Sequence, residues 1–176
     1  GLPDNVSYML KRGYLVYGLD IRDLPPNQHL PYGFCFIKGD VRKTGLPGAL
    51  VDVVTCVSSL EHVGVAGRYG MMEEDEEGDR KAMAEMRRVL KDEGLLLLTT
   101  HFGVRAVYEG LHRIYDEKQI RGLTQGFNVE AEEYYCREEV EPYHYPIKAA
   151  ICLKPSGASI IPCCSCHRLY CVAPPY

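Results

Sequence analysis

Four short runs of almost continuous apolar residues narrow the choice of fold more than anything else in this sequence. They cover residues 14–20, 34–40, 51–57 and 95–101. A strand that is buried on both faces has this composition, whereas a strand with one solvent-facing side alternates between apolar and polar residues. The four runs therefore predict a sheet whose strands are mostly parallel and covered on both faces.

Amphipathic helical patterns lie between and beside these runs. The clearest covers residues 79–94, where apolar residues recur every three or four positions and Gly94 is expected to cap the helix. Another helix is expected to start at Asp116, which has the capping-box spacing to Gln119. A first helix, over residues 3–13, precedes the first apolar run. These patterns predict strands and helices that alternate along the chain.

The remaining segments complete an open sheet. The Pro-rich segment 21–33 is expected to contain no helix, and residues 127–136 and 147–153 are expected to form two closing strands. We therefore predict an α/β, Rossmann-like fold with a mostly parallel sheet, helices on both faces and a C-terminal antiparallel hairpin. The domain is expected to cover residues 1–153, and residues 154–176 are expected to form a Cys- and Pro-rich tail.

Composition and charge argue against several classes of partner. The 176-residue chain has a formal net charge of −4, so no broad basic surface favours nucleic acid or anionic lipid. No apolar run approaches the roughly 18 residues of a membrane-spanning helix. The eight cysteines lack the spacing of a disulfide framework, so a reduced, cytoplasmic protein is expected. Cys163, Cys166, His167 and Cys171 crowd more tightly than ordinary zinc ligands, and we expect no metal there.

Polar residues gather where the apolar runs end. They are Asp20, residues 39–41, residues 58–62 and His101. In open α/β sheets, ligands bind beyond the carboxyl ends of the strands. A carboxylate at Asp20 can accept both hydroxyl hydrogens of a ribose, and residues 39–41 offer an acceptor and an N–H to an adenine edge. A single Asp after a strand is more often a turn residue, but two acids at successive strand ends favour a nucleoside.

The stretches "GYLVYGLDIRD", "FIKGDVRKTGLPGALVDVVTCVSSLEHVG" and "GDRKAMAEMRRVLKDEGLLLLTTHFG" resemble class I S-adenosylmethionine-dependent methyltransferases. The closest likeness is to microbial methyltransferase domains that carry a "VSSLEHVG…RYG" block and an "HRIYD" block, and it covers residues 5–153. The resemblance implies S-adenosyl-L-methionine as the cofactor and in-line transfer of its methyl group to a small-molecule or unknown acceptor. It also implies these cofactor contacts: Asp20, Ile21, Gly39, Asp40, Val41, Val57, Ser58 and Leu60.

The reacting end of the ligand is expected near His62. Because an imidazole has an ordinary pKa near 6.5, His62 is the best candidate for a general base or for a contact to the methyl acceptor. His101 is a weaker candidate that is better explained as a structural residue. The other expected substrate contacts are Glu61, Tyr69, His112 and Tyr115.

One part of the family pattern is missing from this sequence. In dinucleotide-binding folds the ribose acid follows a glycine-rich loop by roughly 20 residues, and counting back from Asp20 reaches the start of the given sequence. The strand before that loop, the family's central one, is missing too. In the family it lies between the strands matching 14–20 and 51–57. Two inner strand edges should then lack a partner, unless those strands pair directly, another segment fills the gap, or a second chain does so by self-association.

Two other functions stay open. The absent glycine loop favours a catalytically inactive, methyltransferase-like interaction module. A nicotinamide-dependent Rossmann oxidoreductase would also use Asp20 for its ribose, although the "VSSLEHV" and "RRVLKDEG" blocks argue against it.

Overall fold

A computed structural model describes residues 4–67, 69, 73–108, 110–135, 147–155 and 168–172. Its strands are β1 (Leu15–Asp20), β2 (Phe34–Lys38), β3 (Val51–Val57), β4 (Leu90–Phe102), β5 (Ala106–Tyr108), β6 (His112–Ile114), β7 (Phe127–Tyr135), β8 (Ile147–Pro155) and β9 (Arg168–Val172). Its helices are α1 (Asp4–Lys11), α2 (Gly78–Val89) and α3 (Glu117–Leu123), with a single 3-10 turn, η1 (Leu60–His62).

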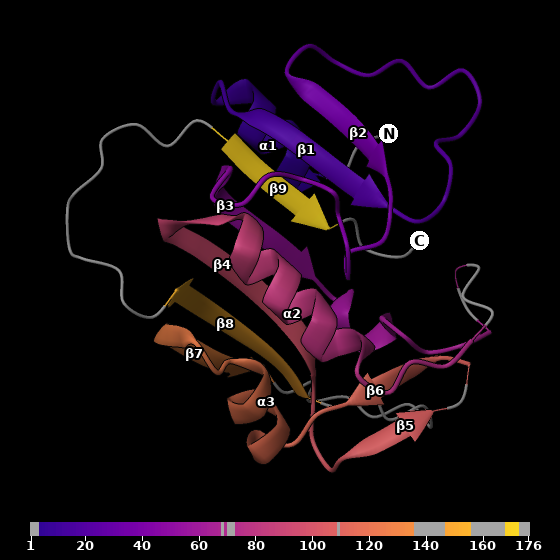
Figure 1. Cartoon of the computed structure of the whole chain (residues 1–176), viewed down its shortest axis with the longest axis vertical. Helices are drawn as coiled ribbons and strands as arrows, with labels where there is room; N and C mark the ends of the chain where they lie inside the picture. Colours follow the sequence, from indigo (N-terminus) through magenta and orange to yellow (C-terminus); the bar gives the residue numbers. More distant parts are fainter. Residues whose placement is uncertain are drawn as a thin grey trace.

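Within these residues, seven strands form one sheet in the order β2-β1-β9-β3-β4-β8-β7, and β5 pairs with β6 separately (Figure 1). Neighbouring strands from β2 to β4 are parallel, whereas β8 pairs antiparallel with both β4 and β7. The parallel part and the closing hairpin predicted from the sequence are both confirmed. The sheet as a whole is mixed.

The gap expected between β1 and β3 is filled by β9, which comes from the Cys-rich tail. Its backbone pairs residues 168–172 with Leu15–Leu19 of β1 and residues 169–172 with Val53–Cys56 of β3. Both edges therefore find their partner within the same chain, which is one of the three outcomes that the sequence left open. The strand order makes β9 the backbone link between the β2-β1 pair and the rest of the sheet.

Two clusters of buried side chains show that helices cover both faces of the sheet. The larger cluster joins α2 and α3 to β3, β4 and β8, and it contains Met86, Leu96 and Leu153, all at 0% exposure. The smaller one packs Val6 of α1 against Val16 of β1. Figure 1 shows α2 and α3 in front of the sheet. In the described segments no helix is long and apolar enough to cross a membrane.

The main helix ends earlier than the sequence predicts. Helix α2 stops at Val89, and Leu90 already pairs with Val51 as the start of β4. Gly94 therefore lies inside a strand and does not cap the helix. A Cβ at Gly94 would lie 3.2 Å from the Asp52 carbonyl oxygen and closer still to atoms of residues 90 and 91, so the residue is a glycine because backbones approach closely there.

The other predicted helices are confirmed. Asp116 caps α3 with its side chain accepting from the Gln119 N–H, and Gln119 reaches back to the Asp116 N–H, which completes the capping box. Helix α1 starts and ends within the predicted range. The Pro-rich segment 21–33 contains no helix, so β1 leads to β2 through a loop alone. This leaves the carboxyl ends of β1 and β2 accessible.

Candidate functional site

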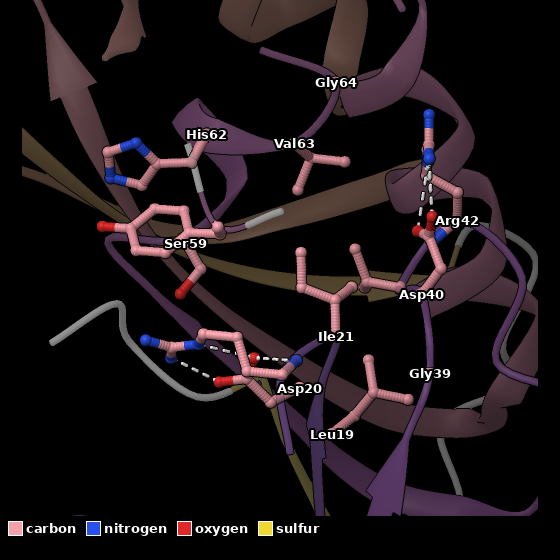
Figure 2. Close-up of a pocket in the computed structure, with 13 residues that line it drawn as sticks. Leu19, Asp20, Ile21, Gly39, Asp40, Arg42, Ser59, His62, Val63 and Gly64 are labelled. Carbon is pink, nitrogen blue, oxygen red and sulfur yellow. Dashed lines mark hydrogen bonds and ion pairs between the residues drawn. The ribbon is translucent and has the colours of Figure 1, made fainter. Parts of the chain in front are cut away.

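A pocket lies at the carboxyl ends of the parallel strands, where the sequence placed the ligand. It has about 570 Å³ of empty space between its walls, a figure that includes the open solvent at its mouth. In Figure 2, Asp40 and His62 lie at opposite ends of the labelled residues, and Ile21 and Val63 project into the space between them. One wall follows β1 and β2, and the other follows β3. Its lining residues are Leu19, Asp20, Ile21, Arg22, Gly39, Asp40, Val41, Arg42, Ser59, His62, Val63, Gly64 and Tyr69.

Asp20 is paired with an arginine two residues further along the chain. Its Oδ1 accepts from the backbone N–H of Arg22 and from Nε of the same residue, both at 2.9 Å, and its Oδ2 accepts from Nη2 at 2.5 Å. These hydrogen bonds raise the pKa of Arg22 despite its partial burial. The guanidinium also lies over the ring of Tyr69, 5.1 Å from its centroid.

Asp40 repeats this arrangement at the end of β2. The N–H of Arg42 donates to Oδ1 at 2.8 Å, and Nη2 donates to Oδ2 at 2.6 Å. Burial alone would raise the pKa of Asp40, but the hydrogen bonds from Arg42 outweigh it, so the pKa is lowered. Arg42 also donates to Asp75 at 2.7 Å, and Asp75 in turn accepts from Lys81 of α2. The loop after β2 is therefore fastened to the helix.

The chain turns sharply where β3 ends. Ser58 has φ +45°, a left-handed conformation that is uncommon outside glycine, and its N–H donates to Thr99 of β4. The chain then enters η1, whose first two residues point away from solvent: Leu60 and Glu61 both have 0% exposure. Glu61 accepts from Thr100 at 3.3 Å and lies 3.6 Å from Nε2 of His101. This buried anchor holds the turn that carries His62.

His62 lies in the pocket wall with its tautomer defined. Its Nδ1 lies 2.6 Å from the carbonyl oxygen of Leu111, and because a carbonyl can only accept, Nδ1 carries the proton and Nε2 carries the lone pair of the neutral ring. The ring meets Tyr69 edge-on at 5.4 Å and His112 at 6.1 Å between centroids. His112 in turn contacts His101 at 4.6 Å. The imidazole rings of His101, His112 and His62 therefore form a row of contacts from the buried Glu61 to the pocket wall.

The "HRIYD" block supports this wall from behind. Arg113 of β6, at 6% exposure, donates to the carbonyl oxygens of Val63 and Asp75, the latter at 3.0 Å. Tyr115 is fully buried, and its hydroxyl lies 3.4 Å from the Leu60 carbonyl oxygen. Burial raises the pKa of Tyr115 well above its ordinary value. Through these contacts Tyr115 holds η1 in place, and Arg113 holds the residue after η1 and the loop that carries Asp75.

The structure brings together seven of the residues predicted for the site: Asp20, Ile21, Gly39, Asp40, Val41, His62 and Tyr69. Six others do not line the pocket: Val57, Ser58, Leu60, Glu61, His112 and Tyr115. Of these, Leu60, Glu61 and Tyr115 have 0% exposure and His112 has 8%, so they support the wall instead.

Sequence reasoning missed Arg22 and Arg42 as pocket residues, although the repeated Asp-x-Arg spacing at two strand ends was a readable signal. The predicted metal-free tail falls partly outside the described residues, since Cys163, Cys166 and His167 are not among them. In the described segments, no group of three or more His, Cys, Asp or Glu residues is arranged to hold a metal.

Many of the solved structures that align with this chain are S-adenosylmethionine-dependent methyltransferases. The Burkholderia thailandensis 1,6-didemethyltoxoflavin-N1-methyltransferase, with bound 1,6-didemethyltoxoflavin and S-adenosylhomocysteine, aligns with a TM-score of 0.67 at 15% identity over 86% of this chain and 66% of that one. A Methanosarcina mazei S-adenosylmethionine-dependent methyltransferase aligns at 0.62 with 16% identity over 86% of each chain. The [4+2]-cyclase SpnF aligns at 0.56 with 14% identity over 86% of this chain and 80% of its own. The chain therefore has the class I methyltransferase fold.

The sequence also matches the model of a protein family. This model matches residues 47–146 and is described as "Caenorhabditis protein of unknown function, DUF268", and the chain belongs to this family. The match begins before β3 and includes η1, α2 and the "HRIYD" block. No curated protein matches the sequence.

Proposed function

We propose that this protein binds S-adenosylmethionine in the pocket and transfers its methyl group to an acceptor that approaches His62. The observation that carries the proposal is the pocket itself. One of its walls combines carboxylates with apolar side chains and the other carries an imidazole, and both lie at one edge of a methyltransferase fold. The 1,6-didemethyltoxoflavin methyltransferase is a neighbour whose structure holds S-adenosylhomocysteine.

The lining residues fit the adenosine half of such a cofactor. Ile21, Val41 and Val63 offer apolar contact to a flat base, and Asp20 supplies an acceptor for ribose hydroxyls on the same side of Figure 2 as His62. Asp40 lies at the far end, where it would meet the outer edge of the base. This order, with the base far from the imidazole and the sugar nearer, directs the reactive end of the ligand toward His62.

When bound, the cofactor supplies a methyl group on a sulfonium, and this chain's own residues have the simpler tasks of alignment and proton removal. Nε2 of His62 carries the lone pair because Nδ1–H donates to Leu111, so the ring can accept a proton from a hydroxyl or an ammonium acceptor. Tyr69 packs against the same ring and restricts its rotation. Alignment of the two reactants can lower the barrier of such a displacement by about 7–11 kcal/mol.

A second candidate is a cofactor-binding module without methyl transfer. The strand that fills the central position, β9, is followed directly by Ala-Pro-Pro-Tyr at residues 173–176, four residues that include no glycine. That loop is what cradles the methionine end in the family that the sequence resembles. The module would bind adenosine through the same wall and leave the sulfonium poorly held.

Calorimetry with S-adenosylhomocysteine and the full chain tests the shared step. Asp20→Asn is expected to weaken binding by about 1.5 kcal/mol, roughly tenfold, the lower end for a hydrogen bond to a charged group. The matched control is Asp23→Asn, because Asp23 pairs with Lys38 at the surface, with its side chain 79% exposed and outside the pocket. Equal affinities for the two variants would contradict the ribose assignment, and no binding to any of the three proteins would contradict the function.

If binding is seen, the His62→Asn variant distinguishes the two candidate functions, methyl transfer and cofactor binding without transfer. Transfer should depend on the imidazole base, while S-adenosylhomocysteine affinity should stay within about twofold, because His62 lies at the other end of the pocket from Asp40. Incorporation of tritium into candidate acceptors from methyl-labelled S-adenosylmethionine measures transfer. Binding without transfer to any acceptor would favour the module.

A further inference from the structure

The twin Asp-x-Arg motifs at the ends of β1 and β2 differ in how firmly each arginine is held. Arg42 pairs with two carboxylates, Asp40 and Asp75. In the part of the chain that the structure describes, Arg22 pairs with the carboxylate of Asp20 alone, and its side chain is 35% exposed. Arg22 is therefore the arginine that can leave its acid at the smaller cost.

The hydrogen bonds that Asp20 already accepts leave too few acceptor positions for both hydroxyls of a ribose. A carboxylate offers about four acceptor positions, and Arg22 takes three of them, with its N–H and Nε on Oδ1 and its Nη2 on Oδ2. The two neighbouring hydroxyls of a ribose would need two acceptor positions, and one remains. A cis-diol therefore cannot donate both hydrogen bonds to Asp20 while the guanidinium stays in place.

Moving the guanidinium alone solves this shortage. The backbone N–H of Arg22 can stay on Oδ1, because it belongs to the turn and not to the side chain. Release of Nε and Nη2 would leave three acceptor positions, enough for the diol. The guanidinium already has a second contact surface, the ring of Tyr69 at 5.1 Å, which also lines the pocket. Cation–π contact would hold the displaced side chain near the site.

We propose that Arg22 guards the ribose site: its guanidinium holds Asp20 in the free protein and releases it, keeping its contact with Tyr69, when a nucleoside with a 2′,3′-diol binds. This inference rests on the proposed function, because it assumes that an adenosine ligand enters the pocket. It adds that the protein reduces its own affinity for that ligand through an internal competitor, and that the competitor acts on the sugar hydroxyls and not on the base.

Calorimetry with two probes, adenosine and 2′,3′-dideoxyadenosine, tests the guard on the full chain. Arg22→Ala is expected to bind adenosine about three- to tenfold more tightly than the natural chain, because the competing ion pair is gone. Its affinity for 2′,3′-dideoxyadenosine should not change. Arg22→Lys, which keeps the charge but cannot form the fork, should give a smaller gain. Arg80→Ala is the control, since Arg80 is exposed and pairs with Glu77 outside the pocket.

The outcomes separate the guard from the function. Adenosine affinity in Arg22→Ala that is equal to or weaker than in the natural chain overturns the guard and leaves adenosine binding intact. A gain of the same size for the dideoxy probe also overturns it, because it would show that a smaller side chain merely opens space. No adenosine binding by any variant overturns the proposed function and the guard together. If Arg22→Ala does not fold, Arg22→Lys decides by the same comparison.

Discussion

The loop that carries Asp40 is tied to α2 through Glu85, and this tie should make the stability of the protein depend on pH. Glu85 accepts four hydrogen bonds: its Oε1 accepts from the Thr44 N–H at 2.9 Å, from the Thr44 hydroxyl at 2.6 Å and from Arg88 at 2.7 Å, and its Oε2 accepts from Arg88 at 2.7 Å. The hydrogen bonds from Arg88, and then those from Thr44, outweigh the effect of burial and lower the pKa of Glu85 from 4.5 to about 2.

This shift sets both the size and the direction of the effect. Each unit of pKa difference between the folded and unfolded states is worth about 1.4 kcal/mol, so the shift has a ceiling of about 3 kcal/mol. The Glu85 side chain is 11% exposed, but Arg88 is 44% exposed and screened, so we expect about 2 kcal/mol. Because the folded pKa is the lower one, this stabilisation is complete above pH 4.5 and is lost as the pH falls toward 2.

Glu85→Gln should therefore lower the free energy of unfolding by about 2 kcal/mol at pH 7, measured by urea denaturation. The gap between the natural chain and the variant should shrink by roughly half at pH 3. Glu77→Gln is the control: Glu77 pairs with Arg80 at the same i,i+3 spacing, but at 57% side-chain exposure, so its loss should stay below about 1 kcal/mol. A Glu85→Gln gap that does not change between pH 7 and pH 3 would refute this reasoning.

Three further substitutions test the parts that hold the pocket. Tyr170→Pro, in the middle of β9, should cost about 3 kcal/mol or more in urea denaturation because it removes a ladder N–H from a central strand; a small loss would argue against β9 at this place. Gly64→Ala should cost clearly more than Gly13→Ala, since both have φ near +80° but only Gly64 would bring its Cβ to 2.3 Å from a backbone oxygen; equal losses would contradict the close contact. Arg113→Lys should lower the melting temperature by several degrees, because an ammonium cannot donate to two separate carbonyls as the guanidinium does; an unchanged melting temperature would mean that the two bonds contribute nothing.

The sheet could be predicted because the local amino-acid composition of each strand indicates where that strand lies in the sequence. The run at 51–57 is buried on both faces in the structure, as its almost continuous apolar residues predict. The capping box at Asp116 is equally local, since both of its partners lie within four residues. The helix cap predicted at Gly94 was wrong because the surroundings of this glycine are only partly local. That residue lies inside β4, where a Cβ would meet atoms of residues 90 and 91 and also the Asp52 carbonyl oxygen of β3, and this last contact, over 42 positions, leaves no local pattern.

The pocket was predictable to the same extent. Asp20 and Asp40 could be assigned because strand ends are where an open sheet binds its ligands. Their arginines were missed, since an i+2 pair across a turn depends on a backbone conformation that the apolar pattern does not report. Glu61 was placed near the substrate because it precedes His62 in the same motif, and Tyr115 because it belongs to the "HRIYD" block. In the structure Glu61 contacts Thr100, and Tyr115 contacts the Leu60 carbonyl oxygen. Both side chains therefore support the turn from its buried side.

The place of β9 links the tail of the sequence to the geometry of the site. Val172 pairs with Leu19 on one side and with Cys56 on the other, so β9 sets these two residues level with each other across the sheet. Asp20 follows Leu19 at once, and Ser59, which lines the pocket, comes three residues after Cys56, so the offset of the two pocket walls along the strands depends on the register of this one strand. A slip by one residue would shift one wall by about 3.3 Å along the strands, whereas an error of about 1 Å is enough to cost 100-fold in rate. A strand read from sequence as part of a separate tail therefore sets the alignment on which the proposed transfer depends.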